Sequence, residues 1–388
     1  MRKPRQPAGI SRYVTSTVSG ESVRAFVPGN LPPDSRVLDL PALQSILAEA
    51  NQAVGRLDGM TSALPDLNLF LYSYVRKDAV LSSQIEGTQS SLSDLLLYEN
   101  SEIPGVPLDD VQEVSNYVAA LNHGLKRMRG GFPLSLRLIR EIHEVLLSKG
   151  RGSHAQPGEF RKSQNWIGGT RPGNAAFVPP PPEYAVDCMV QLETFLHDQR
   201  DGLPLLVRAG LVHAQFETIH PFLDGNGRVG RLLITFMLTA GQMLREPVLY
   251  LSLFFKKYRR LYYDRLNGTR ENDGWNQWLD FFLQGVRDTA NQAAKTARSI
   301  DELFRKDKEK IAQLGRGAAS ALLIYQFAQA NPLFSVKNAA LATGISFPAA
   351  SGAIGRLAEM GILGESSGKR RGRLFVYTKY LDILNRDL

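Results

Sequence analysis

The chain has 388 residues, of which 43% are hydrophobic and 22% are charged, and its formal net charge is +8. This composition is typical of a soluble globular protein of two or three domains and argues against intrinsic disorder. No apolar run is long enough to span a bilayer, and no apolar stretch follows the basic start, so neither a membrane span nor a secretory signal is expected. The single cysteine, Cys188, cannot form an internal disulfide, which favours a reducing, cytoplasmic location.

Apolar residues recur at helical spacing along most of the chain, which predicts a mainly α fold. Helices are expected over 43–50, 134–147, 184–196, 205–218 and 227–238, the last of them buried. The segment 165–178 differs, because apolar pairs flank a middle rich in Gly, Pro and Asn, as in a β-hairpin. It is the only strand pair that the pattern predicts ahead of the C-terminal region.

The C-terminal region has its own pattern. One long helix or a pair of helices is expected over 275–308, and Gly315-Arg316-Gly317 then interrupts it. Three short helices and a hairpin with a basic tip follow, which is the order of a winged helix-turn-helix domain. The predicted domains are a helical N-terminal region (1–110), a central core (111–300), a linker (301–316) and the winged helix-turn-helix domain (317–388).

The last part of the chain is also basic. Residues 316–388 carry nine Lys or Arg against four Asp or Glu, which hints at an anionic partner. The expected recognition helix, 346–356, is poor in side chains that read bases, with Ser351 and Arg356 the obvious candidates. Contact with DNA and contact with a protein or a second copy are therefore both open. In the DNA case the wing would offer phosphates four cations: Lys369, Arg370, Arg371 and Arg373.

A glycine-flanked turn marks the segment most suited to binding an anion. Gly225 and Gly227 flank Asn226 immediately before an expected helix. Successive backbone N–H groups can therefore point into one concavity at a helix N-terminus, where the helix dipole favours negative charge.

Four side chains around this turn add chemistry. Arg228 and Arg231 are three residues apart, so they share the first-turn face and can clamp further phosphates. Asp224 is an acid among phosphate-binding groups, which predicts Mg²⁺. His220, at the preceding helix-to-loop junction, is the natural proton acceptor near neutral pH. Each feature alone is commonplace, but together they indicate a nucleotide site.

The segment from His220 to Arg231 resembles the signature of the Fic family, His-x-Phe-x-Asp/Glu-Gly-Asn-Gly-Arg-x-x-Arg, at every fixed position. Fic enzymes are mostly helical and transfer AMP from ATP to Ser, Thr or Tyr hydroxyls of proteins. The resemblance, which covers most of 65–300, implies that His220 deprotonates the target hydroxyl and that Asp224 holds Mg²⁺ on the phosphates. It also implies that the turn and Asn226 stabilise the α-phosphate, while the two arginines hold the leaving phosphates.

The hairpin at 165–178 extends the resemblance, because Fic proteins carry a flap ahead of the motif that covers the nucleotide. The family pairs the flap edge with an extended segment of the target, a case of strand addition. The expected flap residues are Trp166, Ile167, Gly168, Gly169 and Thr170.

Residues 82–87 resemble the inhibitory motif of the family, Ser/Thr-x-x-x-Glu-Gly/Asn. Ser82 and Glu86 are four residues apart on an expected helix and so share a face. In the family this Glu pairs with the second motif arginine, here Arg231, and spoils the seat of the γ-phosphate. Holding the active state near one per cent needs about 2.7 kcal/mol, whereas an exposed ion pair supplies about 0.2–1 kcal/mol. The pair is therefore expected to be partly buried, and Glu86 to repel phosphates as well.

These features predict an autoinhibited protein adenylyltransferase that uses ATP and Mg²⁺ and modifies a target protein, itself included. Three alternatives stay open: hydrolysis of AMP from modified proteins at the same site, another donor such as UTP or CDP-choline, and a DNA-binding regulator whose Fic core is a sensor or is inactive. The family also suggests a homodimer. The other histidines stand in no metal-ligand spacing, and His213 is predicted to be structural.

Overall fold

The computed structural model describes residues 11–18, 20–62, 67–99, 106–198, 200–366 and 372–386. Over these residues the fold is mainly helical, with two small antiparallel sheets. No helix in the described ranges combines the length and the apolar character that crossing a membrane requires. The N-terminal elements are β1 (Arg12–Val18), β2 (Glu21–Val27), α1 (Leu40–Ser62), α2 (Leu67–Ile85) and α3 (Leu92–Glu99). The central elements are α4 (Leu108–Arg129), α5 (Leu136–Leu146), the 3-10 turn η1 (Pro172–Asn174), α6 (Pro182–His197), α7 (Leu205–Ile219), α8 (Asn226–Ala240), α9 (Ser252–Lys257) and α10 (Arg259–Glu271).

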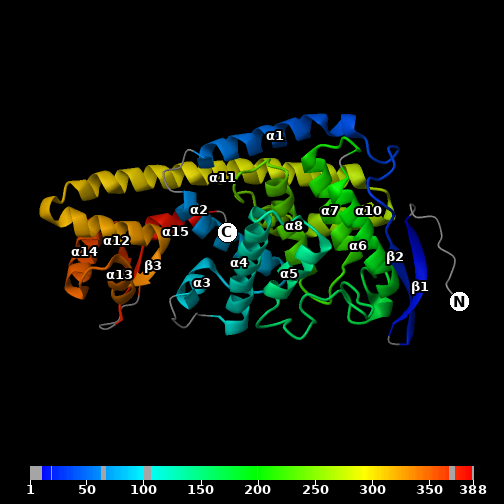
Figure 1. Cartoon of the computed structure of the whole chain (residues 1–388), viewed down its shortest axis with the longest axis horizontal. Helices are drawn as coiled ribbons and strands as arrows, with labels where there is room; N and C mark the ends of the chain where they lie inside the picture. Colours follow the sequence, from blue (N-terminus) through cyan, green and yellow to red (C-terminus); the bar gives the residue numbers. More distant parts are fainter. Residues whose placement is uncertain are drawn as a thin grey trace.

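Helix α11 (Trp275–Ala312) runs along the longest dimension of the molecule, and α1 packs beside it (Figure 1). Small residues on α11, among them Ala290, Ala293 and Ala297, are buried and let α1 approach closely. The prediction of a linker over 301–316 is wrong for its first part, because 301–312 continue α11 without a break. The periodic apolar positions of 275–300 simply carry on to Ile311, which is buried.

Helices α7 and α8 form the centre of the core. Every residue of α7 from Leu206 to Ile219 is buried, and α8 packs against it. The Trp278 indole donates to the Gly210 carbonyl, 2.9 Å away. His213 is hydrogen bonded at both ring nitrogens, to the carbonyl of Gly230 and the hydroxyl of Tyr262, each at 2.9 Å. His213 is therefore a satisfied core residue, as its spacing predicted.

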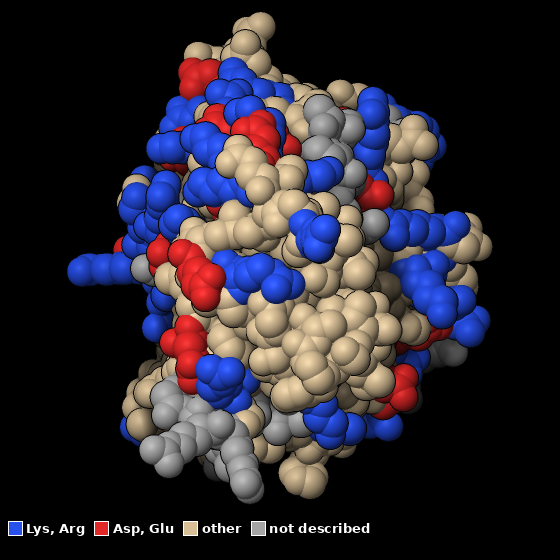
Figure 2. Space-filling view, turned by 90° about the vertical axis from the view of Figure 1, so that its left-hand side faces the viewer, with Lys and Arg blue, Asp and Glu red and all other residues tan. Residues whose placement is uncertain are grey.

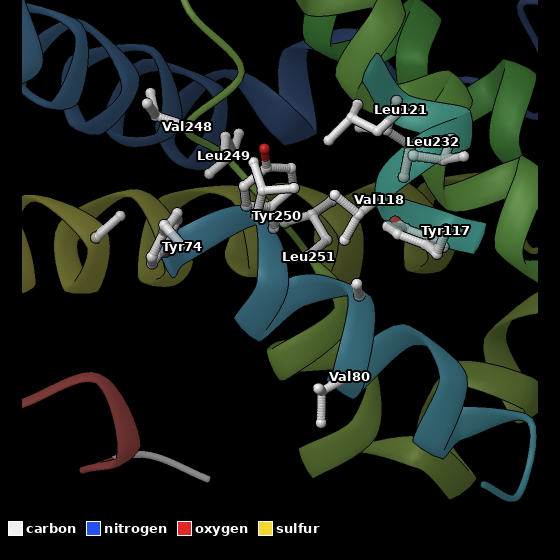
Figure 3. Packing of buried hydrophobic residues seen from close by; sticks show 14 of the residues in the cluster. Tyr74, Val80, Tyr117, Val118, Leu121, Leu232, Val248, Leu249, Tyr250 and Leu251 are labelled. Atoms are coloured by element: carbon white, nitrogen blue, oxygen red, sulfur yellow. The ribbon is translucent and has the colours of Figure 1, made fainter. Parts of the chain in front are cut away.

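Helix α2 is fixed against this core by apolar packing, seen from close by in Figure 3. The residues in that view come from α2, α4, α8 and the segment before α9, and all are buried: Tyr74, Val80, Tyr117, Val118, Leu121, Leu232, Val248, Leu249, Tyr250 and Leu251. A polar contact reinforces the packing, since the Tyr117 hydroxyl donates to Asp78 at 2.7 Å. The C-terminal end of α2, where the predicted inhibitory residues lie, is thus held in one place.

The strand pair expected at 165–178 is reduced to a single bridge between Ile167 and Phe177, with η1 between them. A regular hairpin lies at β1–β2, so the prediction that 165–178 is the only strand pair ahead of the C-terminal region is wrong, and the predicted helical N-terminal region includes two strands at 12–27. Alternating exposure along β1 is the period-2 signal that was missed. The two hairpins are joined, because the Phe26 N–H donates to the Val178 carbonyl at 2.9 Å.

The C-terminal elements form their own end of the molecule, where Lys and Arg side chains, together with fewer Asp and Glu side chains, border an area largely without charged side chains (Figure 2). Ser346 caps the third helix there as expected, accepting from the Ala349 N–H. Arg356 does not point outward as a base reader, because its Nη2 donates to Ser320 Oγ at 3.1 Å. Three of the predicted wing cations, Lys369, Arg370 and Arg371, lie outside the described residues. The elements are α12 (Ala318–Ala330), β3 (Leu333–Ser335), α13 (Val336–Thr343), α14 (Phe347–Glu359), β4 (Gly364–Glu365), β5 (Leu374–Val376) and α15 (Thr378–Asn385), with the strands in the order β3-β5-β4.

Buried hydroxyls join this end to the rest of the chain. The Tyr377 hydroxyl donates to Asp307 of α11 at 2.7 Å, and Asp307 is almost fully buried. The Tyr380 hydroxyl donates to Ser73 Oγ of α2 at 2.9 Å. The C-terminal elements are therefore anchored to α11 and α2 together.

Replacing Tyr377 with Phe removes the donor to Asp307 and leaves a buried carboxylate with one hydrogen bond fewer. We expect this variant to lose about 1–3 kcal/mol of stability, measured by urea unfolding of the full chain. Tyr13→Phe is the matched control, because that ring is 44% exposed on β1. Equal unfolding midpoints for the two variants would contradict the structural importance of the contact.

Candidate nucleotide site around His220

The loop between α7 and α8 turns sharply at His220, whose φ of 48° places it in the left-handed region. Arg161, which is buried, holds this turn: its Nε donates to the His220 carbonyl at 2.9 Å, and its backbone N–H donates to the Pro221 carbonyl. A cation at the C-terminus of α7 also complements the helix dipole. Local backbone geometry therefore sets the position of the His220 side chain.

The glycine turn shapes the start of α8. Gly225 has φ 77°, a conformation that favours glycine, and α8 begins at Asn226. Both polar atoms of the Asn226 side chain bond to the backbone of Phe222, each at 2.8 Å. That amide thus closes the loop, and the backbone N–H groups of the first turn of α8 are the donors left for an anion.

Arg228 is tied to an acid that the sequence did not single out. Its Nη1 donates to Glu113 of α4 at 2.9 Å, and both side chains are buried. Arg151 pairs with the same carboxylate at 2.8 Å. Burial raises the pKa of Glu113, and the two arginines oppose that rise. Arg228 thus lies beside the helix N-terminus with its position fixed by α4.

Arg231 lies beside both predicted inhibitory residues. Its Nε donates to Ser82 Oγ at 2.8 Å and its Nη2 to Glu86 Oε1 at 2.7 Å. The Arg231 side chain is 3% exposed and that of Glu86 is 31% exposed, so the pair is partly buried. Burial acts to raise the pKa of Glu86, but Arg231 outweighs it and the pKa lies below its ordinary value.

The Glu86 carboxylate also lies against the first turn of α8. A Cβ placed on Gly227 would be 2.2 Å from Glu86 Oε1, so only a glycine admits the carboxylate there. An anionic side chain thus occupies the N-terminal end of α8, the place where the dipole and the free N–H groups favour a phosphate.

Asp224 is the one predicted metal ligand. Its Oδ1 accepts from the Gly225 N–H at 2.6 Å, and its side chain is 43% exposed. Within the described residues no group of three or more His, Cys, Asp or Glu could hold a metal by itself. A single solvent-facing carboxylate beside a phosphate site does fit Mg²⁺, which keeps several waters and takes substrate phosphate oxygens as further ligands.

His220 and Glu217 face each other across one turn. The distance from His220 Nδ1 to Glu217 Oε2 is 4.0 Å. Burial, with Arg161 and Arg270 nearby, lowers the pKa of His220 to about 3, so the imidazole is neutral at physiological pH. Burial raises the pKa of Glu217 to about 7, and the Glu86 carboxylate adds to that rise.

The segment 165–178, which is the expected flap, lies next to this site. Its exposed residues include Gly168, Gly169 and Thr170, while Trp166 is partly exposed. The Asn165 amide donates to the Phe222 carbonyl, in the loop between α7 and α8, at 3.0 Å. Arg270 of α10 lies over the Phe177 ring, 3.8 Å from its centroid. On the outer side, Arg171 pairs with Glu21 of β2 at 2.8 Å.

The sequence analysis missed four charged residues that line this site: Glu113, Arg161, Glu217 and Arg270. Glu113 and Glu217 each interrupt an apolar helical face, which is a detectable signal for a buried charge with a special role. Arg161 and Arg270 stand in segments whose distance from the motif along the chain hides their proximity to His220.

The raised pKa of Glu217 has a measurable effect on stability. Between its ordinary value and about 7, the folded chain keeps a proton that the unfolded chain has lost, so the contribution of this group to stability falls as pH rises through that window. Glutamine does not titrate. We therefore expect Glu217→Gln to raise the melting temperature relative to wild type more at pH 8 than at pH 5. Thermal unfolding at both pH values checks this, and an equal difference at the two would contradict it.

Comparison with protein families agrees with the geometry of the site. Residues 44–126 match the Fic/DOC family N-terminal model, and residues 133–238 match the Fic/DOC family model. The first range ends within α4 and includes Glu86, and the second includes the flap, His220 and Arg231.

Curated relatives and solved structures show the same similarity. The chain is 31% identical over 222 residues to the protein adenylyltransferase Fic of Aedes aegypti, covering 55% of this chain and 41% of that protein. It is 31% identical over 194 residues to the protein of the same name from Culex quinquefasciatus, covering 49% and 36%. The matched part is thus less than half the length of these relatives.

Two solved structures share the fold at low identity. A Fic family protein from Desulfovibrio desulfuricans G20 has a TM-score of 0.57 at 20% identity, covering 88% of this chain and 97% of that one. Fic-1 from C. elegans has a TM-score of 0.52 at 21% identity, covering 68% and 75%. Residues 44–126 and 133–238 thus match the Fic/DOC family models and show distant homology to proteins named Fic protein adenylyltransferase, and the two solved structures share the fold.

Proposed function

We propose that this chain is an autoinhibited protein adenylyltransferase that moves AMP from ATP to a hydroxyl group of a target protein. The observation that carries the proposal is the position of Glu86. Its carboxylate lies on the first turn of α8 and binds Arg231, the two elements best suited to hold phosphates. An acid in that position is explained if a nucleotide competes for the same place.

The chemistry follows from the side chains that surround the turn. His220 is neutral, so its Nε2 can accept the proton of a Ser, Thr or Tyr hydroxyl. The hydroxyl oxygen then bonds to the α-phosphorus of ATP, and the bond to the leaving pyrophosphate breaks. N–H groups at the start of α8 stabilise the charge on the α-phosphate, and Arg231, once released from Glu86, holds the leaving phosphates.

Asp224 is the residue that would hold Mg²⁺. The ion supplies neutralisation of phosphate charge when it is bound. The turn at Gly152 leaves room for this carboxylate, since a Cβ on Gly152 would lie 2.5 Å from Asp224 Oδ2. Arg228, fixed by Glu113, adds positive charge on the same side.

Burial makes the inhibitory contact stronger than an exposed ion pair. Arg231 makes three hydrogen bonds to the end of α2, two to Ser82 and one to Glu86, and it is nearly inaccessible to solvent. Like charges also oppose ATP, because its phosphates would approach the Glu86 carboxylate. Both effects favour the blocked state, for which a strong brake needs a bias of about 2.7 kcal/mol.

The target and the C-terminal elements complete the proposal. An extended segment of the target would pair with the flap edge near Ile167–Thr170, by strand addition. Self-modification is included, because the chain presents its own hydroxyls. The C-terminal elements, three helices with a small sheet, have the order of a winged helix-turn-helix domain, and we assign them to that class.

Label transfer tests the proposal. With Mg²⁺ and ATP labelled at the α-phosphate, we expect Glu86→Gly to label itself about tenfold or more faster than wild type, because the brake is removed. ATP labelled at the γ-phosphate should give no label, since pyrophosphate leaves. The double variant Glu86→Gly, His220→Ala is the control and should lose the α-label. Absence of α-label from every variant, with added candidate targets, would overturn the proposed activity.

A further inference from the structure

Glu217 is a buried carboxyl group beside the site that the steps above do not use. It lies on α7 one turn before His220, and its side chain is 9% exposed. Its Oε1 has no hydrogen-bond partner among the described residues. A Cβ on Gly230 would be 2.4 Å from that oxygen, so α8 admits the carboxyl group only because a glycine faces it. Burying a carboxyl group with an unsatisfied oxygen opposes folding, which points to a role in function.

Other charged and titratable groups interact with both Glu217 and His220. Arg231 of α8, Arg270 of α10 and Glu86 after α2 surround the Glu217 carboxyl group. The Tyr262 hydroxyl of α10 faces it as well. On the His220 side the neighbours are Arg161, Arg270 and again Glu86. Two of the three groups around the imidazole are therefore permanent cations.

This environment poses a problem for proton transfer. A neutral imidazole suits a base, but the imidazolium that forms when it takes the hydroxyl proton lies beside Arg161 and Arg270. Glu86 opposes these cations only while it blocks the site, and it must leave before ATP binds. Glu217 stays, and its Oε2 is the carboxyl oxygen 4.0 Å from His220 Nδ1. In the described part of the chain that ring nitrogen makes no hydrogen bond to a side chain, and the Glu217 backbone also interacts with the imidazole.

We propose that Glu217 is a positioning residue for His220. Its carboxylate faces Nδ1, keeps a proton on that nitrogen, and so leaves the lone pair of Nε2 free for the target hydroxyl. After transfer, the same carboxylate compensates the charge of the imidazolium. The arrangement resembles in its logic the acid that orients a catalytic histidine through its second nitrogen. The inference rests on the proposed function and names a residue that serves the same site.

Kinetics in the unblocked background test the assignment. With Glu86→Gly as the parent, we expect Glu217→Gln to lower kcat of α-label transfer about 10- to 100-fold, while KM for ATP changes less than about twofold. The acid limb of the pH profile of kcat should also shift. Glu217→Asp should recover part of the rate, because a charge is restored at a longer distance. Glu144→Gln, an exposed carboxyl on α5, is the matched control and should change nothing.

A spectroscopic measurement separates this inference from the proposed function. In ¹⁵N-histidine spectra at pH 8, above the pKa of about 7 of Glu217, the His220 signals are identified by their loss in His220→Ala. We expect the Nδ1–H tautomer with Glu217 and a mixture of tautomers with Glu217→Gln. If the parent transfers no label, the adenylyltransferase proposal fails. The positioning role of Glu217 is then tested by the tautomer of His220 alone. A tautomer that does not change, or a parent-like kcat in an active Glu217→Gln variant, would overturn the inference.

Discussion

The buried side chain of Arg231 joins α8 to the end of α2. Three hydrogen bonds from its guanidinium reach Ser82 and Glu86 at the end of α2, and the carboxyl group of Glu217 on α7 also interacts with it electrostatically. A buried guanidinium needs such partners, because an uncompensated charge in the interior is strongly unfavourable. Glu86 is therefore the counter-ion of Arg231 and also lies where, in the function that we propose, a phosphate would bind. If Glu86 leaves, another anion must take its place beside Arg231. Incoming phosphates are the natural replacement.

The position of α2 links this contact to the rest of the chain. Apolar packing holds its middle against α4 and the segment before α9, and Tyr117 binds Asp78 one turn before Ser82. Its N-terminal half contacts α12 and α15, with the Tyr380–Ser73 hydrogen bond between them. Helix α2, which ends at Ile85 just before Glu86, thus reaches from the C-terminal elements to the candidate nucleotide site. Its last turn is buried as well, since Leu81, Ser82, Ser83 and Ile85 are almost inaccessible to solvent.

Several buried polar groups around the site lack hydrogen bonds, which lowers the stability of the fold there. Glu217, Glu113 and His220 each hold a buried polar atom without a full set of hydrogen bonds among the described residues. Such groups are rare in a well-packed core, and here they gather around one helix N-terminus. Glycines at 227 and 230 on the same face of α8 bring carboxyl groups close to its backbone. The carboxyl groups of Glu86 and Glu217 thus both approach the backbone of α8.

The amino-acid sequence by itself predicted the helical class, the glycine turn before α8, the contact of residues 82–86 with Arg231 and the order of the C-terminal elements. These are local features, set by periodicity, by glycine positions and by a motif contiguous in the chain. Only the tertiary structure decided that β1–β2 supports the flap, that α11 replaces a linker, and that Glu113, Arg161, Glu217 and Arg270 surround the motif. Glu217 lies only three positions before His220, but Glu113 lies 107 positions before it, Arg161 lies 59 before it and Arg270 lies 50 after it, so no local pattern marks these three as its neighbours. Side chains so far apart become one site only when packing closes the core, because burial and charge compensation act through space and not along the chain.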